Sequence, residues 1–500
     1  MNLEEVGQEI VKTPQELILG PTPINEYNFS GAAVVLEHLH TAELFINTQP
    51  LYYSPESIWW AWNFEKCCWV MIDEIDLLNS LNRNNPNLRI LDYRTRSEIL
   101  QALKMKARAN KPLEGKKTWI QFKKKIIDLE TGDEFDAAPK YFITTPIPWE
   151  LGNTEETPVM DRLFTEWVGE KWKETLCEVL AFCILPDYPL HRVICLIGSG
   201  RNGKSSFLGI VTKFVGKNNV CTTDFDLLIT SRFESAKLFK KLVCEMGEIN
   251  STIFKRTNWL KKLTGGDTVG FELKGKTPFD DTNTAKLIIA TNTLPETTDK
   301  TTGFYSRWLI IDFKNQFKEN PNLLDQIPDQ EYCNLARKCI SKVKELIKRG
   351  SFTNEGSYEE REKIYEEKAA PINEFLEKYC KKDVNALTPF YKLHDAYTEF
   401  LASRGTRVVS KLSFGILLRA RGFKTERQIH YTKDDGAQST MRAVEGLKLS
   451  EEEQTDTKDT TDTNLSSQLT IREPIENNLS PVSFLSGDIQ PCKVEVEYYM

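Results

Sequence analysis

The chain has 500 residues, of which 40% are hydrophobic and 27% are charged, a composition typical of a globular protein with room for about two to four domains. Its formal net charge of −7 comes from residues 451–500, where 11 acidic residues stand against 3 basic ones, so the charge does not exclude a nucleic-acid partner for the rest of the chain. No transmembrane run, signal peptide or zinc-ligand spacing is present, so we expect a cytoplasmic protein, in the host cell if it is viral, with no membrane partner.

Residues 1–185 are expected to contain an irregular lead followed by a mixed α/β domain. Three prolines make residues 1–30 irregular, and a helical pattern runs from about residue 31 to residue 110. Alternating apolar residues predict strands and hairpins over residues 117–150, and a helix is expected over residues 160–182. The helical part holds a tryptophan cluster that we expect in the core, with base stacking as the alternative: Trp59, Trp60, Trp62 and Trp69.

An apolar stretch with acidic residues, Val70 to Asp76, lies in the same domain. It resembles a strand closed by metal-binding carboxylates, which is one alternative. We expect instead a helix with an acidic face that continues through Leu78. In a nucleotide-binding core the carboxylate strand follows the phosphate loop, and this stretch precedes it.

The most informative motif is GSGRNGKS at residues 198–205. An apolar strand is predicted before it at residues 192–197, and a helix after it that ends at Gly216. A strand, G-x-x-x-x-G-K-[ST] and a helix are typical of a phosphate-binding loop for ATP, in which Lys204 reaches the phosphates and Ser205 binds Mg²⁺. The expected nucleotide-binding residues are Gly198, Ser199, Gly200, Arg201, Asn202, Gly203, Lys204, Ser205 and Ser206.

Two further strands are expected to end in polar residues that complete this site. A strand over residues 242–247 places Glu248 at its carboxyl end, where it would act in catalysis and hold Mg²⁺. Glu245 lies inside the strand and either assists or pairs locally. The apolar run at residues 285–290 is followed by Asn292, whose amide would contact the γ-phosphate and the attacking water.

Basic residues lie between and after these strands. Turns at Gly-Gly-Asp (265–267) and Lys-Gly-Lys (274–276) predict hairpins, on which lysines suit contact with a phosphate backbone; a solvated loop is the alternative. Arg307 precedes another apolar strand. It is expected to reach a γ-phosphate held by an adjacent subunit, and the alternative is a surface arginine paired with Asp299 or Glu296.

The order of these motifs resembles superfamily 3 helicases of the phage, plasmid and poxvirus primase-helicase type. The resemblance extends to the segments at residues 123–132 and 139–146 and covers about residues 50–450. It implies an AAA+-like P-loop NTPase core with a parallel sheet at residues 186–350. A mixed α/β helicase-associated domain would precede this core at residues 31–185, and a winged-helix module would follow it at residues 371–449. We expect residues 450–500 to be an acidic, disordered tail.

The resemblance implies an ATP-dependent replicative DNA helicase that forms a ring, usually a hexamer. Single-stranded DNA would pass through the ring with 3′–5′ polarity, and duplex DNA would lie at the fork or origin. The alternatives are an origin-binding initiator with little unwinding and a ring NTPase for packaging or remodelling. Any priming is expected from a separate primase or polymerase. Lys204, Glu248, Asn292 and Arg307 would be catalytic, and Lys261, Lys274 and Lys276 would contact DNA.

Two positions depart from the family pattern. Met246-Gly-Glu248 replaces the more common acidic pair, and Ser306 stands where many members carry a second arginine.

In the last module, helices are expected at residues 389–403 and 410–421, and strands at residues 424–431 and 439–445 would flank the wing. Its basic face would bind duplex DNA through Arg419, Arg421 and Lys424, alongside Arg404, Arg407, Lys411 and Arg427; a solvated helix surface is the alternative.

Overall fold

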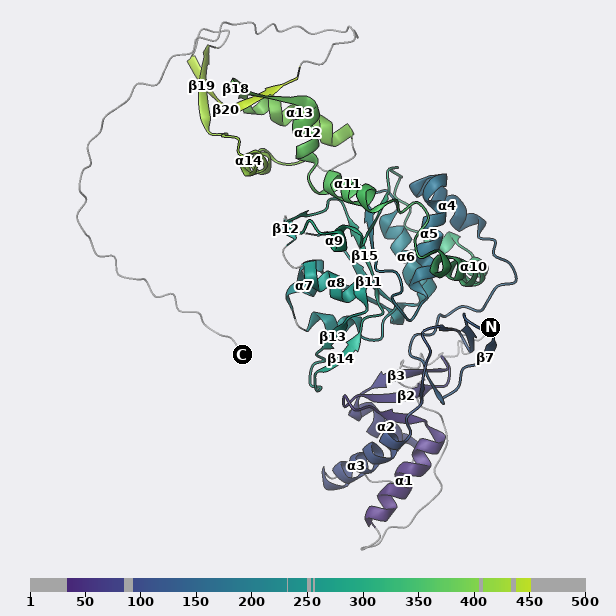
Figure 1. The fold of residues 1–500 in the computed structure, drawn as a ribbon. Coiled ribbons are helices and arrows are strands. Elements are labelled where there is room, and N and C mark those ends of the chain that lie inside the picture. Colours follow the sequence, from purple (N-terminus) through teal and green to yellow (C-terminus); the bar gives the residue numbers. More distant parts are fainter. Residues whose placement is uncertain are drawn as a thin grey trace, which may run out of the picture.

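The computed structural model describes residues 34–84, 93–231, 233–249, 253–254, 257–403, 408–432 and 438–450. Figure 1 shows an N-terminal α/β part, a central part built on a parallel sheet, and a C-terminal part with its own sheet. The expected irregular lead and the expected acidic tail lie outside the described residues. Within the described ranges, every helix is too short or too polar to cross a membrane.

The N-terminal part is a three-stranded antiparallel sheet packed against helices. Its elements are α1 (Val34–Thr48), β1 (Leu51–Tyr53), β2 (Trp59–Asn63), β3 (Cys68–Ile72), α2 (Glu74–Asn84) and α3 (Tyr93–Ala109). The tryptophan cluster lies on β2 and β3, and its side chains are 0–4% exposed, which confirms the core interpretation over base stacking. The helical prediction is wrong for residues 51–72, because β2 is buried on both faces and so lacks the alternation that marks a strand.

The acidic stretch after β3 starts the helix α2. Residues 70–72 complete β3, so the expectation of one helix from Val70 onward is wrong for these residues. The carboxylate of Asp73 accepts a hydrogen bond from the N–H of Asp76 at 2.7 Å, as at a helix N-terminus. Glu74 pairs with Lys104 at 2.8 Å. Asp73 and Glu74 thus have partners within the chain.

Short strands and two helices connect this part to the central sheet. The strands are β4 (Leu113–Glu114), β5 (Trp119–Phe122), β6 (Lys125–Asp128), β7 (Glu134–Asp136) and β8 (Tyr141–Phe142), which confirms the predicted hairpins. The predicted helix over residues 160–182 is divided into α4 (Pro158–Val168) and α5 (Glu170–Cys183). Gly169 separates them with a φ of +80°, a conformation that side chains with a Cβ rarely adopt.

The central sheet has five parallel strands in the order β10-β11-β15-β9-β17. They are β9 (Val193–Ile197), β10 (Val220–Thr223), β11 (Val243–Met246), β15 (Lys286–Thr291) and β17 (Trp308–Asp312). One face of the sheet is covered by α4, α5, α6 (Lys204–Val215) and α10 (Asp329–Arg349). The opposite face packs against α8 (Thr257–Gly265), α9 (Thr302–Tyr305) and α11 (Tyr358–Ala369), and against tryptophans of β2 and β3. The mixed α/β fold with a parallel sheet is therefore confirmed.

Smaller elements surround the sheet. These are η2 (Lys217–Asn219), α7 (Phe225–Thr230), η3 (Glu234–Leu238), β12 (Ile253–Phe254), β13 (Thr268–Phe271), β14 (Phe279–Thr282), β16 (Glu296–Thr297) and η4 (Leu324–Gln326). The Lys-Gly-Lys turn joins the antiparallel strands β13 and β14, as predicted, and Gly275 has a φ of +76° there. The Gly-Gly-Asp segment ends α8 rather than turning a hairpin, because the apolar residues Leu260 and Leu263 pack as one buried helix face.

The C-terminal part comprises α12 (Pro371–Tyr379), β18 (Cys380–Pro389), α13 (Phe390–Ser403), α14 (Lys411–Ala420), β19 (Arg427–Thr432) and β20 (Gln438–Leu449). Its antiparallel sheet has the order β18-β20-β19. Both predicted helices are present, and Ser410 caps α14 by accepting a hydrogen bond from the N–H of Ser413. Arg404 and Arg407 lie outside the described residues. The winged-helix assignment stays a prediction.

Candidate nucleotide-binding site

Three loops meet at the carboxyl edge of the central sheet. Residues 198–203 join β9 to α6, Asn292 directly follows β15, and Glu248 follows β11 by two residues. Because β15 lies between β9 and β11, the strand beside the loop strand is the one that ends in Asn292. Chain order does not reveal which later strand inserts next to β9.

Close contacts of the loop leave no room for a side chain at positions 198 and 203. A Cβ on Gly198 would lie 2.5 Å from the carbonyl oxygen of Phe313, and one on Gly203 would lie 2.6 Å from the ring of Trp167. Gly203 also has a φ of +94°. Trp167 belongs to α4, far from the motif in sequence, and nothing in the sequence indicates this contact. The chain after β17 and the helix α4 therefore hold the loop in its curled shape.

The loop presents a row of backbone donors. Among the described residues, the N–H groups of residues 199–206 have no hydrogen-bond acceptor. On either side, the N–H of Gly198 donates to Thr291 at 3.3 Å and that of Phe207 donates to Gly203 at 2.8 Å. Successive free N–H groups at the start of a helix attract anions. Ser205 is exposed on the first turn of α6, where its hydroxyl can reach a bound group.

The side chain of Lys204 connects the three loops. Its ammonium donates to the carbonyl of Gly198 at 2.6 Å, to Oδ1 of Asn202 at 3.0 Å and to Oδ1 of Asn292 at 3.5 Å. Nδ2 of Asn292 in turn donates to a carboxylate oxygen of Glu248 at 2.5 Å. Burial lowers the pKa of Lys204, and the nearby negative charge of Glu248 opposes this. Three sequence-predicted site residues thus form one chain of hydrogen bonds.

Glu245 occupies a different place from Glu248. Its carboxylate points to α6 and accepts a hydrogen bond from the Thr212 hydroxyl at 2.7 Å. Burial raises its pKa, while this hydrogen bond opposes the change. Glu245 is therefore a half-buried residue that pairs locally, as the second of the two sequence readings expected.

Arg307 lies at the amino edge of the sheet, away from the loop of its own chain. Its carbonyl accepts a hydrogen bond from the N–H of Val193 at 2.6 Å, where the parallel strands β9 and β17 begin. Five residues of β9 separate this edge from the loop, which corresponds to about 17 Å at ~3.3 Å per residue. The Arg307 side chain and the Lys204 side chain therefore belong to opposite edges.

The guanidinium of Arg307 is half-buried and contacts only neutral oxygens among the described residues. Its Nε donates to the Thr264 hydroxyl at 3.0 Å, and other N–H groups donate to the carbonyls of Gly303 and Lys261. The alternative reading of a surface arginine paired with Asp299 or Glu296 is wrong, because those carboxylates pair with Lys261 and Arg421.

The lysines expected at DNA differ in their surroundings. Lys261, on α8, pairs with Asp299 at 2.7 Å and donates to the Thr301 hydroxyl at 2.9 Å. Contact of Lys261 with DNA would require this pair to break. Lys274 and Lys276 lie in the turn between β13 and β14, where Lys274 is exposed and Lys276 is half-buried. The turn therefore offers two cations at one tip.

The basic residues of the C-terminal part also differ. Arg421 is only 15% exposed in its side chain and pairs with Glu296 of the central part at 2.9 Å. Arg419 donates to the Thr425 hydroxyl at 3.0 Å but remains 39% exposed, and Lys424 is exposed. Arg421 thus joins the C-terminal part to β16, and its contact with DNA stays a prediction.

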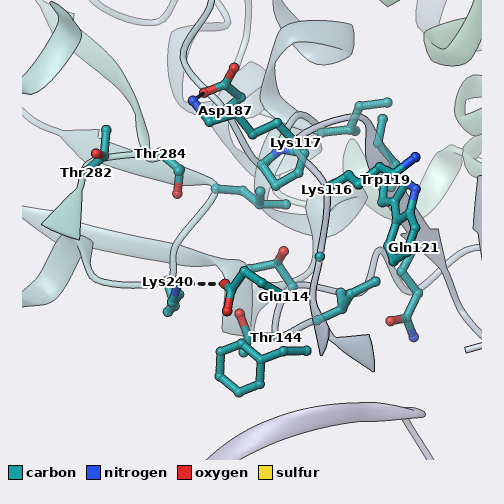
Figure 2. Close-up of a pocket in the computed structure, with 18 of the residues that line it drawn as sticks. Glu114, Lys116, Lys117, Trp119, Gln121, Thr144, Asp187, Lys240, Thr282 and Thr284 are labelled. Carbon is teal, nitrogen blue, oxygen red and sulfur yellow. Dashed lines mark ion pairs between the residues drawn. The ribbon is translucent and has the colours of Figure 1, made fainter. Parts of the chain in front are cut away.

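A cavity of about 270 Å³ lies at the amino edge of the sheet, between the central part and the short strands β4, β5 and β8 (Figure 2). Lys240 faces Glu114 there at 3.9 Å, and Lys117 pairs with Asp187 at 2.9 Å. The charges that line the cavity are balanced by these pairs. It lies at the edge opposite to the loop at residues 198–203, and none of the predicted site residues line it.

Comparisons with known proteins found one family model and several solved structures similar to this chain. Residues 196–307 match a family model described as a family of unknown function (DUF5906), a segment that includes the loop, Glu248, Asn292 and Arg307. Among solved structures, two A-form apo structures of the NrS-1 C-terminal region match at 11% and 12% identity with TM-scores of 0.42. A further apo structure of this region matches at 12% identity with a TM-score of 0.41, and each comparison covers 82% of this chain and 99% of the other.

Proposed function

We propose that this chain is an ATP-dependent replicative DNA helicase of the superfamily 3 type. The observation that carries the proposal is the row of free N–H groups at residues 199–206, beside an ammonium that Asn292 connects to Glu248. Free amides and a lysine at the start of a helix suit a polyphosphate, and a carboxylate beside them suits hydrolysis. The order of the motifs in the sequence, which resembles that of superfamily 3 helicases, is the reason for proposing a helicase rather than another ATPase.

The residues present fit ATP and Mg²⁺. Main-chain N–H groups and Lys204 would hold the phosphates, while the Ser205 hydroxyl and the Glu248 carboxylate would hold the metal. Mg²⁺, when bound, would neutralise charge on the phosphate oxygens. Glu248 would accept a hydrogen bond from the attacking water and take its proton. Asn292 would hold that carboxylate in place, and Lys204 would stabilise the negative charge that develops.

The position of Arg307 supports hydrolysis between subunits. Because Arg307 and Lys204 lie at opposite edges of one sheet, an arginine that completes the loop site would come from a neighbouring chain. A closed ring of identical subunits satisfies this requirement for every site, and we propose a hexamer. The hairpin of β13 and β14 would carry Lys274 and Lys276 to the single strand inside the ring. The ring would move along the strand with 3′–5′ polarity, as the resemblance to superfamily 3 helicases implies.

A strand-displacement assay tests the proposal. The full chain with ATP and Mg²⁺ should release the labelled strand of a forked duplex, and Glu248→Gln, which keeps the size but not the charge of the side chain, should not. Lys217→Ala, an exposed position after α6, serves as the control. DNA-dependent ATP hydrolysis without strand release would instead support the initiator. A rate of ATP hydrolysis that does not change when DNA is added would support a packaging or remodelling NTPase.

The initiator alternative has one observation in its favour. Residues 404–427 contain seven basic residues and one acidic residue, a balance that suits duplex DNA at an origin. On this reading Arg419 and Lys424 would contact duplex phosphates and the C-terminal part would be a winged-helix module. A separate primase or polymerase would act with the protein in either case, in the cytoplasm of the host cell.

Replacing Lys274 and Lys276 with alanine is expected to weaken binding to single-stranded DNA and to make this binding less dependent on salt concentration. Loss of two phosphate contacts should reduce the slope of log K against log[salt] by about 1.4. Fluorescence anisotropy with labelled oligonucleotide across a salt series measures both effects. ATP hydrolysis without DNA should not change. The matched control is Lys344→Ala with Lys348→Ala, two exposed lysines on α10; an equal loss in the control would remove the assigned role of the hairpin.

A further inference from the structure

The helix α14 and the segment after it form a basic surface. Residues 404–427 contain seven basic residues and one acidic residue. Within the described residues, Lys411, Arg419, Lys424 and Arg427 are exposed. Arg419 lies 3.9 Å from Glu426, and Arg427 donates a hydrogen bond to Glu445 at 3.3 Å, yet both side chains stay 39–49% exposed. The four exposed cations therefore outnumber the two carboxylates beside them.

The same helix exposes apolar side chains between these charges. Leu412 is 71% exposed and Ile416, one turn later, is 52% exposed, while Phe414 and Leu418 fill the core beneath. Residues four positions apart lie on one helix face, so Leu412 and Ile416 form an apolar stripe along the outer side of α14. Phosphate groups of DNA would cover the charges but not this stripe. A chain that is both acidic and apolar would cover both.

Residues 451–500 have this composition. They contain 11 acidic and 3 basic residues, a net charge of −8, together with the apolar residues Phe484, Leu485, Val494, Val496 and Tyr498. The described chain leads into them from β20, the central strand of the C-terminal sheet β18-β20-β19. A segment of 50 residues can span up to about 165 Å at ~3.3 Å per residue, so its length does not prevent contact with α14.

We propose that residues 451–500 dock on the surface formed by Leu412, Ile416 and the exposed basic residues Lys411, Arg419, Lys424 and Arg427. The apolar side chains of the segment cover the stripe, and its carboxylates pair with the surrounding lysines and arginines. Docked in this way, the segment shields the surface from DNA. This shielding rests on the proposed function, whereas the docking does not.

A photo-cross-linker tests the docking in the full chain. p-Benzoylphenylalanine is placed at Leu412 and, in a second variant, at Ile416; both positions are exposed, so neither should disturb folding. Mass spectrometry after irradiation should find cross-links to peptides from residues 451–500 that disappear at about 1 M salt, where the Debye length is only about 3 Å. A mixture of isotope-labelled and unlabelled chains shows whether the link is within one chain. The control is the same cross-linker at Tyr93, which is 85% exposed on α3.

Neutralising the segment tests the shielding. With the acidic residues of 451–500 replaced by Asn and Gln, affinity for duplex DNA should rise about 10-fold at low salt and change little at high salt. Cross-links from Leu412 to another part of the protein, to a second chain, or to nothing would overturn the docking. An unchanged DNA affinity would overturn the shielding. The Lys204→Ala chain should keep its cross-links, so a failure of the ATP site and a failure of the docking give different results.

Discussion

Replacing Lys204 with alanine is expected to lower DNA-stimulated ATP hydrolysis by about 10²- to 10³-fold and to abolish strand displacement. Lys204 is only 8% exposed, and its ammonium lies beside the row of free loop amides, where a phosphate would meet it with little water between them. Alanine removes the only side-chain cation that contacts both the loop and Asn292 within the described residues. Phosphate release in the presence of single-stranded DNA measures the loss.

Two controls separate this loss from misfolding. Lys217→Ala removes an exposed lysine just beyond the other end of α6 and should hydrolyse ATP like the unmodified protein. Thermal unfolding of Lys204→Ala should stay close to that of the unmodified protein, because the hydrogen bonds of Lys204 join it to polar loop atoms rather than to the apolar core. If Lys204→Ala keeps DNA-stimulated hydrolysis, residues 198–205 are not the phosphate loop.

Replacing Arg307 with alanine is expected to lower hydrolysis by about 10³-fold while nucleotide affinity stays the same. In its own chain, Arg307 lies at the amino edge of the sheet and contacts neutral oxygens, so its removal should leave the loop at residues 198–203 unchanged. On the proposed function, the charge that Arg307 would stabilise develops only during phosphoryl transfer, in the site of an adjacent subunit. Single-turnover hydrolysis and fluorescent-nucleotide binding measure the two quantities separately.

Mixed assemblies show where Arg307 acts. A chain with Arg307→Ala still has Lys204, and a chain with Lys204→Ala still has Arg307. When the two inactive variants are combined, some subunit boundaries contain both residues and hydrolysis should partly return. Absence of any recovery, together with a normal assembly size by light scattering, would place the action of Arg307 within one chain. Normal hydrolysis by the Arg307→Ala variant alone would show that Arg307 has no role in ATP hydrolysis.

Local patterns in the sequence predicted the elements around the loop well. β9 and α6 agree with the expected strand and helix because a buried apolar run, a glycine-rich turn and a final Gly216 all act over short distances. Glu248 and Asn292 follow the ends of their strands for the same reason. Strand order was not predictable in this way, since it depends on which crossover places β15 between β9 and β11.

Contacts between distant segments account for most of the differences. The tryptophans of β2 are buried on both faces, so the sequence shows no strand alternation. The contact of Trp167 with Gly203, and the pairs of Lys261 and Arg421 with acidic partners, join residues 36 to 125 positions apart, and no motif marks them. The partners of Lys261 and Arg421 are set by tertiary packing, which local sequence patterns do not reveal.

Because Lys204 and Arg307 lie at opposite ends of β9, the proposed ATP hydrolysis should depend on protein concentration. If each ATP site needs both residues, a solitary chain holds half of one site and half of another and completes neither. Turnover per chain would then rise with protein concentration and level off once association is complete. A cell containing few copies would consume almost no ATP until those copies gather on the same nucleic acid.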